Sequence, residues 1–166
     1  MPAIRHASFA PQVAPDTRLL ILGSLPGARS LAERQYYAHP TNQFWRLVGA
    51  VIGEPLAMMP YDDRLARLRA AKIGLWDVIR TAERRSSSDS EIRAFEAQDL
   101  ASLVATLPKL SMIAFNGGTA AAIGRRQLPP LQSIAVIDLP SSSAANTSGY
   151  AAKLEEWLRL RDAPAQ

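Results

Sequence analysis

Residues 18–27 read Arg-Leu-Leu-Ile-Leu-Gly-Ser-Leu-Pro-Gly, a short apolar run that passes directly into a glycine-rich turn. An apolar run that ends at a glycine is typical of a strand buried on both faces of a sheet, so we expect a strand over residues 18–23. Glycine and proline fix the turn tightly and let its N–H and C=O groups approach a ligand. An ordinary strand-to-loop turn has the same composition. The stretch lacks the phosphate-loop spacing GxxxxGK and the dinucleotide spacing GxGxxG.

Strands and helices alternate on the C-terminal side of this stretch. Further strands are expected over residues 73–79, 111–115 and 133–139. Helices are expected over residues 42–52, 61–71, most of 91–107, 119–126 and 148–160, with loops at 24–41, 81–90 and 140–147. Such alternation predicts an α/β fold, a three-layer αβα sandwich around a four-stranded, mostly parallel sheet.

The carboxyl ends of the predicted strands indicate where a ligand would bind. The strands lead into residues 24–27, 76–77, 116–118 and 140–143. In an open parallel sheet, ligands bind beyond the carboxyl ends of the strands. We therefore expect these four segments to meet at one rim of the sheet and to form the site there.

Length and composition limit the classes of protein to consider. The 166 residues, 48% of them hydrophobic, are enough for one domain with a real core, and we expect a single domain over residues 1–166 with loose tails at 1–16 and 161–166. The lack of a membrane-length apolar run and of an apolar signal segment predicts a cytoplasmic protein without membrane contact, and we expect a monomer. The absence of cysteine excludes disulfides, iron–sulfur clusters and thiolate zinc sites. With two histidines in the chain, a histidine metal site is not expected either, which leaves carboxylates that hold a hard cation such as magnesium as the alternative. We expect no metal and no cofactor.

The charge balance suits a polyanionic partner. The net charge is +4 and the sequence pI about 9.8. A basic surface favours phosphate contacts, and so nucleic acid. Many arginine-rich proteins have the same balance without binding DNA, so charge alone does not decide between these readings.

Residues 36–45, Tyr-Tyr-Ala-His-Pro-Thr-Asn-Gln-Phe-Trp, are the most informative stretch. A loop dense in aromatic rings can stack a planar base, and an asparagine can both donate and accept hydrogen bonds to a base edge or a water. Alternatively, Phe44 and Trp45 are core residues of the following helix and Asn42 is its N-cap. His39 is a candidate base, although a loop histidine beside a proline is more often structural.

Together, the turn at residues 23–27 and the stretch at 36–45 resemble the uracil-DNA glycosylase superfamily. They look most like its family-six branch, the hypoxanthine or deoxyinosine DNA glycosylases, and are similar to the mismatch-specific uracil glycosylases, whose first motif has Asn where Ser24 stands. The resemblance covers residues 18–157 and includes the stretches 74–78, 85–92, 115–117 and 139–146.

The resemblance implies roles for matching positions. Asn42 matches the asparagine taken as catalytic in family six, and Ser24 stands where several branches keep the Asp or Asn that places the attacking water. Tyr37 matches the aromatic residue that stacks on the flipped base, and Asn116 the asparagine that reads the base edge. Further substrate contacts are expected from Leu25, Pro26, Gly27, His39 and Phe44. We assign Asp77 and Asp89 no catalytic role.

The resemblance also implies a DNA-binding loop that enters the minor groove and fills the gap left by the flipped base. Its residues here are Ser141, Ser142, Ser143, Ala144, Ala145 and Asn146, and we expect Arg84 and Arg85 to contact phosphates. For any one arginine, a solvated surface position is the simpler reading. The chain departs from the family at Ser141, where many branches have His or Asn, at Ala144, where family six usually has Pro, and at residues 98–100.

These matches imply a monofunctional DNA glycosylase that hydrolyses the N-glycosidic bond of a flipped deaminated base, hypoxanthine or uracil or both, in base-excision repair. Its partner is then DNA that contains such a base. One alternative is a non-catalytic lesion-binding protein on the same scaffold, suggested by Ser24 and Ser141. The other is a nucleotide- or flavin-binding doubly wound protein, which predicts a phosphate at the turn; the missing phosphate-loop lysine argues against it.

Overall fold

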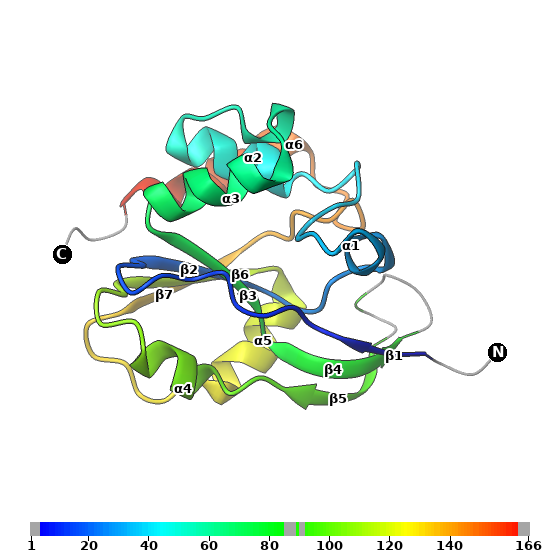
Figure 1. The fold of residues 1–166 in the computed structure, drawn as a ribbon, viewed down its shortest axis with the longest axis vertical. Coiled ribbons are helices and arrows are strands. Elements are labelled where there is room, and N and C mark those ends of the chain that lie inside the picture. Colours follow the sequence, from blue (N-terminus) through cyan, green and yellow to red (C-terminus); the bar gives the residue numbers. More distant parts are fainter. Residues whose placement is uncertain (1–3, 85–88, 90–91, 163–166) are drawn as a thin grey trace.

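The computed structural model describes residues 4–84, 89 and 92–162 of the chain. Its centre is a four-stranded parallel sheet in the order β3-β2-β6-β7 (Figure 1). The strands are β2 (Leu19–Gly23), β3 (Ile73–Asp77), β6 (Met112–Asn116) and β7 (Ala135–Leu139). All three pairings are parallel. The α/β class and the four-stranded parallel sheet predicted from the sequence are confirmed.

Side chains of the central strands alternate between two hydrophobic cores, because successive residues of a strand point to opposite faces. Leu19 and Ile21 of β2 belong to the core on one face, and Leu20 and Leu22 to the core on the other. All five residues of β2 are buried, as are all five of β6. This burial explains why the strand that begins at residue 19 is a continuous apolar run in the sequence.

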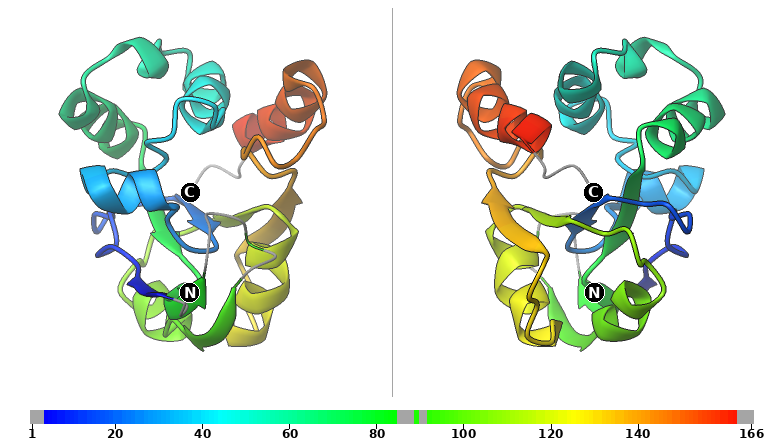
Figure 2. Two further views of the ribbon diagram at one scale, coloured as in Figure 1. Left: turned by 90° about the vertical axis from the view of Figure 1, so that its right-hand side faces the viewer. Right: turned by 90° about the vertical axis from the view of Figure 1, so that its left-hand side faces the viewer.

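Helices cover both faces of the sheet (Figures 1 and 2). On one face lie α2 (Phe44–Ile52), α3 (Tyr61–Ala70) and α6 (Tyr150–Trp157), with the 3-10 turns η1 (Leu56–Met58) and η3 (Leu158–Asp162). On the other face lie α4 (Leu100–Ala105) and α5 (Gly118–Gln127). The short helix α1 (Ala28–Glu33) interrupts the segment predicted as one long loop. None of the helices in the described ranges is long and apolar enough to cross a membrane.

A second sheet was not predicted. It is antiparallel, in the order β1-β4-β5, with β1 (Ile4–Ala7), β4 (Ile79–Arg84) and β5 (Arg93–Ala97). The predictions of a loose tail, over its described residues 4–16, of a loop at 81–84 and of a helix at 93–97 were therefore wrong; residues 1–3 lie outside the described part of the chain. Four of the five residues of β5 are exposed, so this strand has no alternation of apolar and polar residues to reveal it. Residues 85–88, 90–91 and 163–166 lie outside the described part of the chain.

The position of β2 within the sheet places the site. The chain runs from β2 to β3 on one side of the sheet and from β6 to β7 on the other, so the connections diverge between the neighbouring strands β2 and β6. Crevices in doubly wound sheets open at such a switch point, beyond the carboxyl ends of the strands. Here those ends are Gly23, Asp77 and Asn116, with Gly23 directly beside Asp77 in the strand register.

Candidate active site

A cavity of about 560 Å³ lies at the carboxyl ends of the parallel strands. Its volume is within the range of about 300–1,000 Å³ usual for small-molecule sites. The lining includes four segments predicted to converge or to bind substrate, together with two acidic residues: Ser24 to Gly27, Tyr37 to Asn42 in part, Asn116 to Thr119, Ser141 to Asn146, Asp77 and Asp89. The loop that carries Tyr37 and Asn42 thus faces the turn at residues 24–27 across the cavity.

A continuous chain of hydrogen bonds joins Asn42, Ser142 and Asn116. The Ser142 hydroxyl donates to Oδ1 of Asn42 at 2.8 Å and accepts from Nδ2 of Asn116 at 2.9 Å. The main-chain N–H of Ser142 donates to Oδ1 of Asn116 at 2.9 Å. Ser142 is 1% exposed. The structure therefore corrects the prediction that its side chain contacts DNA, because this serine is a buried bridge between the two asparagines.

Main-chain donors fix the orientation of both amide groups. A backbone N–H can only donate, so the atom of Asn116 that faces the Ser142 N–H must be its oxygen. In the same way, the N–H of Phe44 donates to the Asn42 side chain at 3.0 Å and identifies that atom as Oδ1. Asn116 keeps one N–H and one oxygen lone pair for a ligand. Since two donors already occupy Oδ1 of Asn42, this side chain can offer a ligand its N–H groups.

Tyr37 forms one wall of the cavity and rests on Phe44. The two rings stack with centroids 3.8 Å apart and planes 17° apart. Phe44 is fully buried and does not line the cavity, so the prediction that it binds substrate is not supported; it backs Tyr37 instead. Tyr37 has φ 54°, the left-handed region that costs a side-chain-bearing residue of order 1–3 kcal/mol, so the surrounding packing must hold it.

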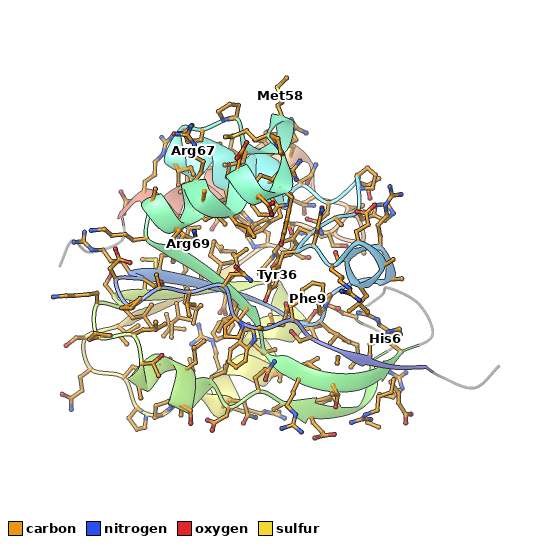
Figure 3. The ribbon with its side chains drawn as sticks, viewed as in Figure 1. His6, Phe9, Tyr36, Met58, Arg67 and Arg69 are labelled. Atoms are coloured by element: carbon orange, nitrogen blue, oxygen red, sulfur yellow. The ribbon has the colours of Figure 1, made fainter. Side chains whose placement is uncertain are left out.

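The residue before Tyr37 anchors it to the N-terminal segment. Phe9 and Tyr36 lie together beneath the helical layer (Figure 3), with ring centroids 5.1 Å apart in an edge-to-face arrangement. The Tyr36 hydroxyl donates to the Ala10 carbonyl at 3.1 Å, and the indole N–H of Trp45 donates to the Tyr36 carbonyl at 3.1 Å. These contacts hold the backbone that places the Tyr37 ring over the cavity.

The Tyr37 hydroxyl is buried at the cavity floor, without a hydrogen-bond partner among the described residues. A Cβ on Gly23 would lie 2.8 Å from this hydroxyl oxygen and 2.8 Å from Oδ1 of Asp77. Only glycine leaves room for both groups. Burial raises the pKa of Tyr37, and the neighbouring Asp77 raises it further while the nearby Asn116 amide opposes the rise, so the phenol stays protonated as a donor.

Asp77, the last residue of β3, is buried beneath the cavity with 3% of its surface exposed. Its Oδ2 accepts a hydrogen bond from the Ser8 hydroxyl at 2.9 Å. Burial raises the pKa of this carboxyl to about 7; the Ser8 hydrogen bond and Arg84 oppose the rise, and the charge of Asp89 adds to it. Asp77 was predicted to lie at the rim of the site, as the end of a strand, but without a catalytic role.

A second acid, Asp89, touches the turn after β2. The Ser24 hydroxyl donates to its Oδ1 at 2.7 Å. Nη1 of Arg84 lies 4.0 Å from the same oxygen, and the Arg84 side chain is 1% exposed. Nη2 of Arg84 also donates to the Pro26 carbonyl. Arg84 is therefore buried behind the turn, which contradicts the prediction of a phosphate contact; Arg85 lies outside the described residues.

His39 lies exposed at the cavity mouth and is held by its neighbour. The main-chain N–H of Thr41 donates to Nδ1 of His39 at 3.2 Å, and the Thr41 hydroxyl lies 2.8 Å from the same atom. Because Nδ1 accepts the main-chain donor, the neutral ring carries its proton on Nε2. In this tautomer the ring has no free nitrogen with which to take a proton from water.

The segment 141–146 is fixed at its base and open at its tip. Lys153, buried in α6, donates from Nζ to the Ser143 carbonyl at 3.1 Å, and the Trp157 indole donates to the Pro140 carbonyl at 2.9 Å. Ala144 and Ala145 are exposed at the tip. An anchored loop with small residues at its tip can enter a narrow groove without losing its shape.

Comparison with known proteins identifies the family. The model of the uracil DNA glycosylase superfamily matches residues 10–161, nearly the whole chain. The chain belongs to this superfamily. Membership confirms the prediction of a DNA glycosylase, and DNA is accordingly the polymer on which it acts. The alternative of a nucleotide- or flavin-binding protein is not supported.

Relatives within the superfamily cover most of the chain. A protein of Methanosarcina barkeri named hypoxanthine DNA glycosylase is 42% identical over 114 residues, 69% of this chain and 72% of the relative. One of the same name from Methanosarcina acetivorans is 43% identical over 144 residues, 86% of this chain and 89% of the relative. The solution NMR structure of a candidate uracil DNA glycosylase from M. acetivorans, 38% identical, superposes with a TM-score of 0.83 over 96% of this chain and 98% of that one.

Proposed function

We propose that this glycosylase removes hypoxanthine from DNA by hydrolysing its N-glycosidic bond, without a cofactor and without cutting the strand. The observation that carries the proposal is the fixed polarity of Asn116 at the cavity floor, next to the ring of Tyr37. Relatives named hypoxanthine DNA glycosylase, more than 40% identical to this chain, support the choice of base.

The free groups of Asn116 match the edge of a deaminated base. Hypoxanthine presents a ring N–H beside a carbonyl oxygen, which pair with the remaining lone pair and N–H of the amide. Adenine presents the opposite pattern, an acceptor nitrogen beside an amino group. Since the Ser142 main-chain N–H prevents the amide from flipping, adenine would leave buried polar groups unpaired, at about 1–3 kcal/mol for each. Uracil has the same pattern as hypoxanthine, so the pocket's shape must separate these two bases.

Tyr37 offsets part of the cost of base flipping. A base that leaves the duplex loses a few kcal/mol of stacking and pairing, least where it was mispaired. Stacking on an aromatic side chain returns about 1–3 kcal/mol. With its other face supported by Phe44, the Tyr37 ring is rigid and presents a flat surface to the cavity.

Donors around the cavity are suited to the charge that develops during bond cleavage. As the bond between C1′ and the base breaks, its electron pair stays on the base. Asn116 and the first turn of α5, at Gly118 and Thr119, line the cavity and can stabilise this negative charge. We propose that the N–H groups of Asn42 hold the attacking water against C1′.

The tip of segment 141–146 is proposed to fill the gap that the flipped base leaves. Ser141, Ser143 and Asn146 line the cavity beside the exposed Ala144 and Ala145, so the tip adjoins the opening through which the base would enter. We further propose that one copy of the chain acts alone, since residues of a single chain build every wall of the cavity described above; size-exclusion chromatography with light scattering tests this.

Incubation with duplex oligonucleotides that each carry one hypoxanthine, uracil, xanthine or mispaired thymine tests the function. Alkaline treatment then cuts every abasic site. We expect strand scission for hypoxanthine after alkali and no scission before it. The Asn42→Ala variant should bind the same duplex with unchanged affinity and lose at least 100-fold in the rate of base release. Retention of lesion DNA by the wild-type protein with no abasic product would favour the lesion-binding alternative.

A further inference from the structure

Few of the described residues that line the cavity can accept the proton that the attacking water must lose. Asn42 can offer N–H groups, because its Oδ1 already accepts from Phe44 and Ser142. The free nitrogen of His39 carries a proton in the neutral ring. Asp77 lines the cavity but is only 3% exposed, and its Oδ2 already accepts from Ser8. Of the two described carboxyl groups that line the cavity, Asp89 is the more exposed, and the Ser24 hydroxyl donates to it.

Ser24 and Asp89 form a directed pair. The Ser24 hydroxyl gives its hydrogen to Oδ1 of Asp89 at 2.7 Å, which leaves the lone pairs of Ser24 Oγ free to accept from a water in the cavity. Both residues line the cavity. The Asp89 side chain is 40% exposed, so a proton received there can pass on to solvent.

Arg84 supports the charged form of Asp89. Its guanidinium is buried, with Nε and Nη1 lacking hydrogen-bond partners in the described part of the chain, and Nη1 lies 4.0 Å from Oδ1 of Asp89. A buried arginine remains charged, so the nearby carboxylate compensates it. Partial burial raises the pKa of Asp89, and Ser24 and Arg84 oppose the rise. Among the described residues, Asp77 at the end of β3 is a second acid close to both Asp89 and Arg84.

We propose that Asp89, acting through Ser24, accepts the proton of the water that attacks C1′, and that Arg84 keeps Asp89 ionised for this task. The inference rests on the proposed function. The water oxygen bonds to C1′ while the bond from C1′ to the base breaks, and that electron pair leaves with the base. One water proton passes to Ser24 Oγ as the hydroxyl hydrogen of Ser24 passes to Asp89. Asp89 returns the proton to solvent, and solvent protonates the released base.

Single-turnover rates on hypoxanthine duplex between pH 5 and 9 test the relay. We expect the wild-type rate to fall on the acid side as Asp89 takes up a proton. In Asp89→Asn, the rate at pH 8 should drop at least 30-fold, the affinity for DNA should stay within threefold, and the acid limb should disappear. Asp77→Asn should keep the acid limb, which separates the two carboxyls. Asp62→Asn, an exposed acid in α3, is the control and should match the wild type.

A double variant distinguishes loss of the carboxylate from structural damage to the turn at residues 24–27. In the double variant Ser24→Asp, Asp89→Asn, the carboxylate moves to position 24, and we expect at least tenfold recovery over Asp89→Asn with a restored acid limb. If Asp89→Asn keeps the wild-type rate and acid limb, or if the double variant shows no recovery over Asp89→Asn, the relay is wrong. Hypoxanthine release by the wild-type enzyme is measured in the same experiment, so failure of the relay and failure of the proposed function are distinguishable.

Discussion

The buried hydroxyl of Ser142 donates to Oδ1 of Asn42 at 2.8 Å, although the two residues are 100 positions apart in the chain. The Ser142 carbonyl also accepts from the main-chain N–H of Gln43 at 2.9 Å. The hydroxyl and the carbonyl of Ser142 thus join the loop that carries Asn42 to the segment after β7. This double link fixes Asn42, the residue proposed to hold the water, against the segment proposed to meet DNA.

Ser142→Ala should therefore damage catalysis more than binding. The substitution leaves Oδ1 of Asn42 and Nδ2 of Asn116 each short of one buried partner, at about 1–3 kcal/mol for each group. We expect at least a tenfold fall in the single-turnover rate, unchanged DNA affinity and a lower free energy of unfolding, measured by urea titration. Ser133→Ala, on an exposed position before β7, is the control. Full activity of Ser142→Ala would show that Asn42 needs no such support.

Tyr37→Phe should leave the protein at least as stable as the wild type while it slows base release. The Tyr37 hydroxyl is buried without a partner in the described residues, and an unpaired buried hydroxyl costs about 1–3 kcal/mol. Its removal should leave the free energy of unfolding unchanged or raise it by about 1 kcal/mol. If the substrate base supplies the missing partner, base release by the same variant falls. A variant that is both less stable and fully active would contradict this reading of the hydroxyl.

Gly23→Ala should close the floor of the cavity. The new Cβ would lie 2.8 Å from both the Tyr37 hydroxyl and the Asp77 carboxyl, and one of them must move. Overpacking of this kind costs about 1–3 kcal/mol of stability. We expect that loss together with at least a 100-fold fall in base release. Gly149→Ala is the matched control, because its Cβ would meet nothing within 4 Å, and it should behave as the wild type.

Asp77→Asn should change how stability depends on pH. The pKa of Asp77 is about 7 in the folded protein, against an ordinary value of 3.8. Between these values the folded state binds more protons than the unfolded state, so this carboxyl lowers stability as pH rises from about 4 to 7, and its full penalty is present above pH 7. At 1.36 kcal/mol per pKa unit, the penalty is of order 4 kcal/mol.

The neutral amide of Asp77→Asn carries no such penalty. Relative to the wild type, the variant should gain stability as pH rises from 4 to 8, by about 2–4 kcal/mol. Urea unfolding at several pH values measures this gain, with Asp62→Asn as the control. A constant difference between variant and wild type across this range would mean that Asp77 is ionised throughout.

The parallel sheet and its rim could be predicted from the sequence because burial on both faces leaves a visible mark. The run at residues 18–23 and its partner at 111–115 are almost wholly apolar, and the strand-end rule then places Ser24 and Asn116 together. The same rule pointed to Asp77. Its importance was missed because a carboxyl at a strand end has the same sequence signal whether it caps a helix or lies buried in a pocket.

Other parts of the site depend on contacts that no local pattern records. The exposed strand β5 and the short strand β1 lack hydrophobic periodicity, so the second sheet could not be predicted. The burial of Arg84, which belongs to that sheet, could not be predicted either. Phe44 has the same appearance in sequence as a ring that touches substrate. Its helical register decides the matter, because it turns the side chain into the core behind Tyr37.

The first strand has a consequence for how the protein is handled. Strand β1 pairs with β4, the next residue, Ser8, holds the carboxyl of Asp77, and Gln12 pairs with Leu75 of β3. A shortened chain that began near residue 17, where the first conspicuous hydrophobic stretch starts, would look complete by sequence. It would leave the edge of β4 unpaired and remove the Ser8 hydrogen bond to Asp77, whose carboxyl lines the proposed base-binding cavity. We expect such a chain to lose activity although every residue that lines the cavity is still present.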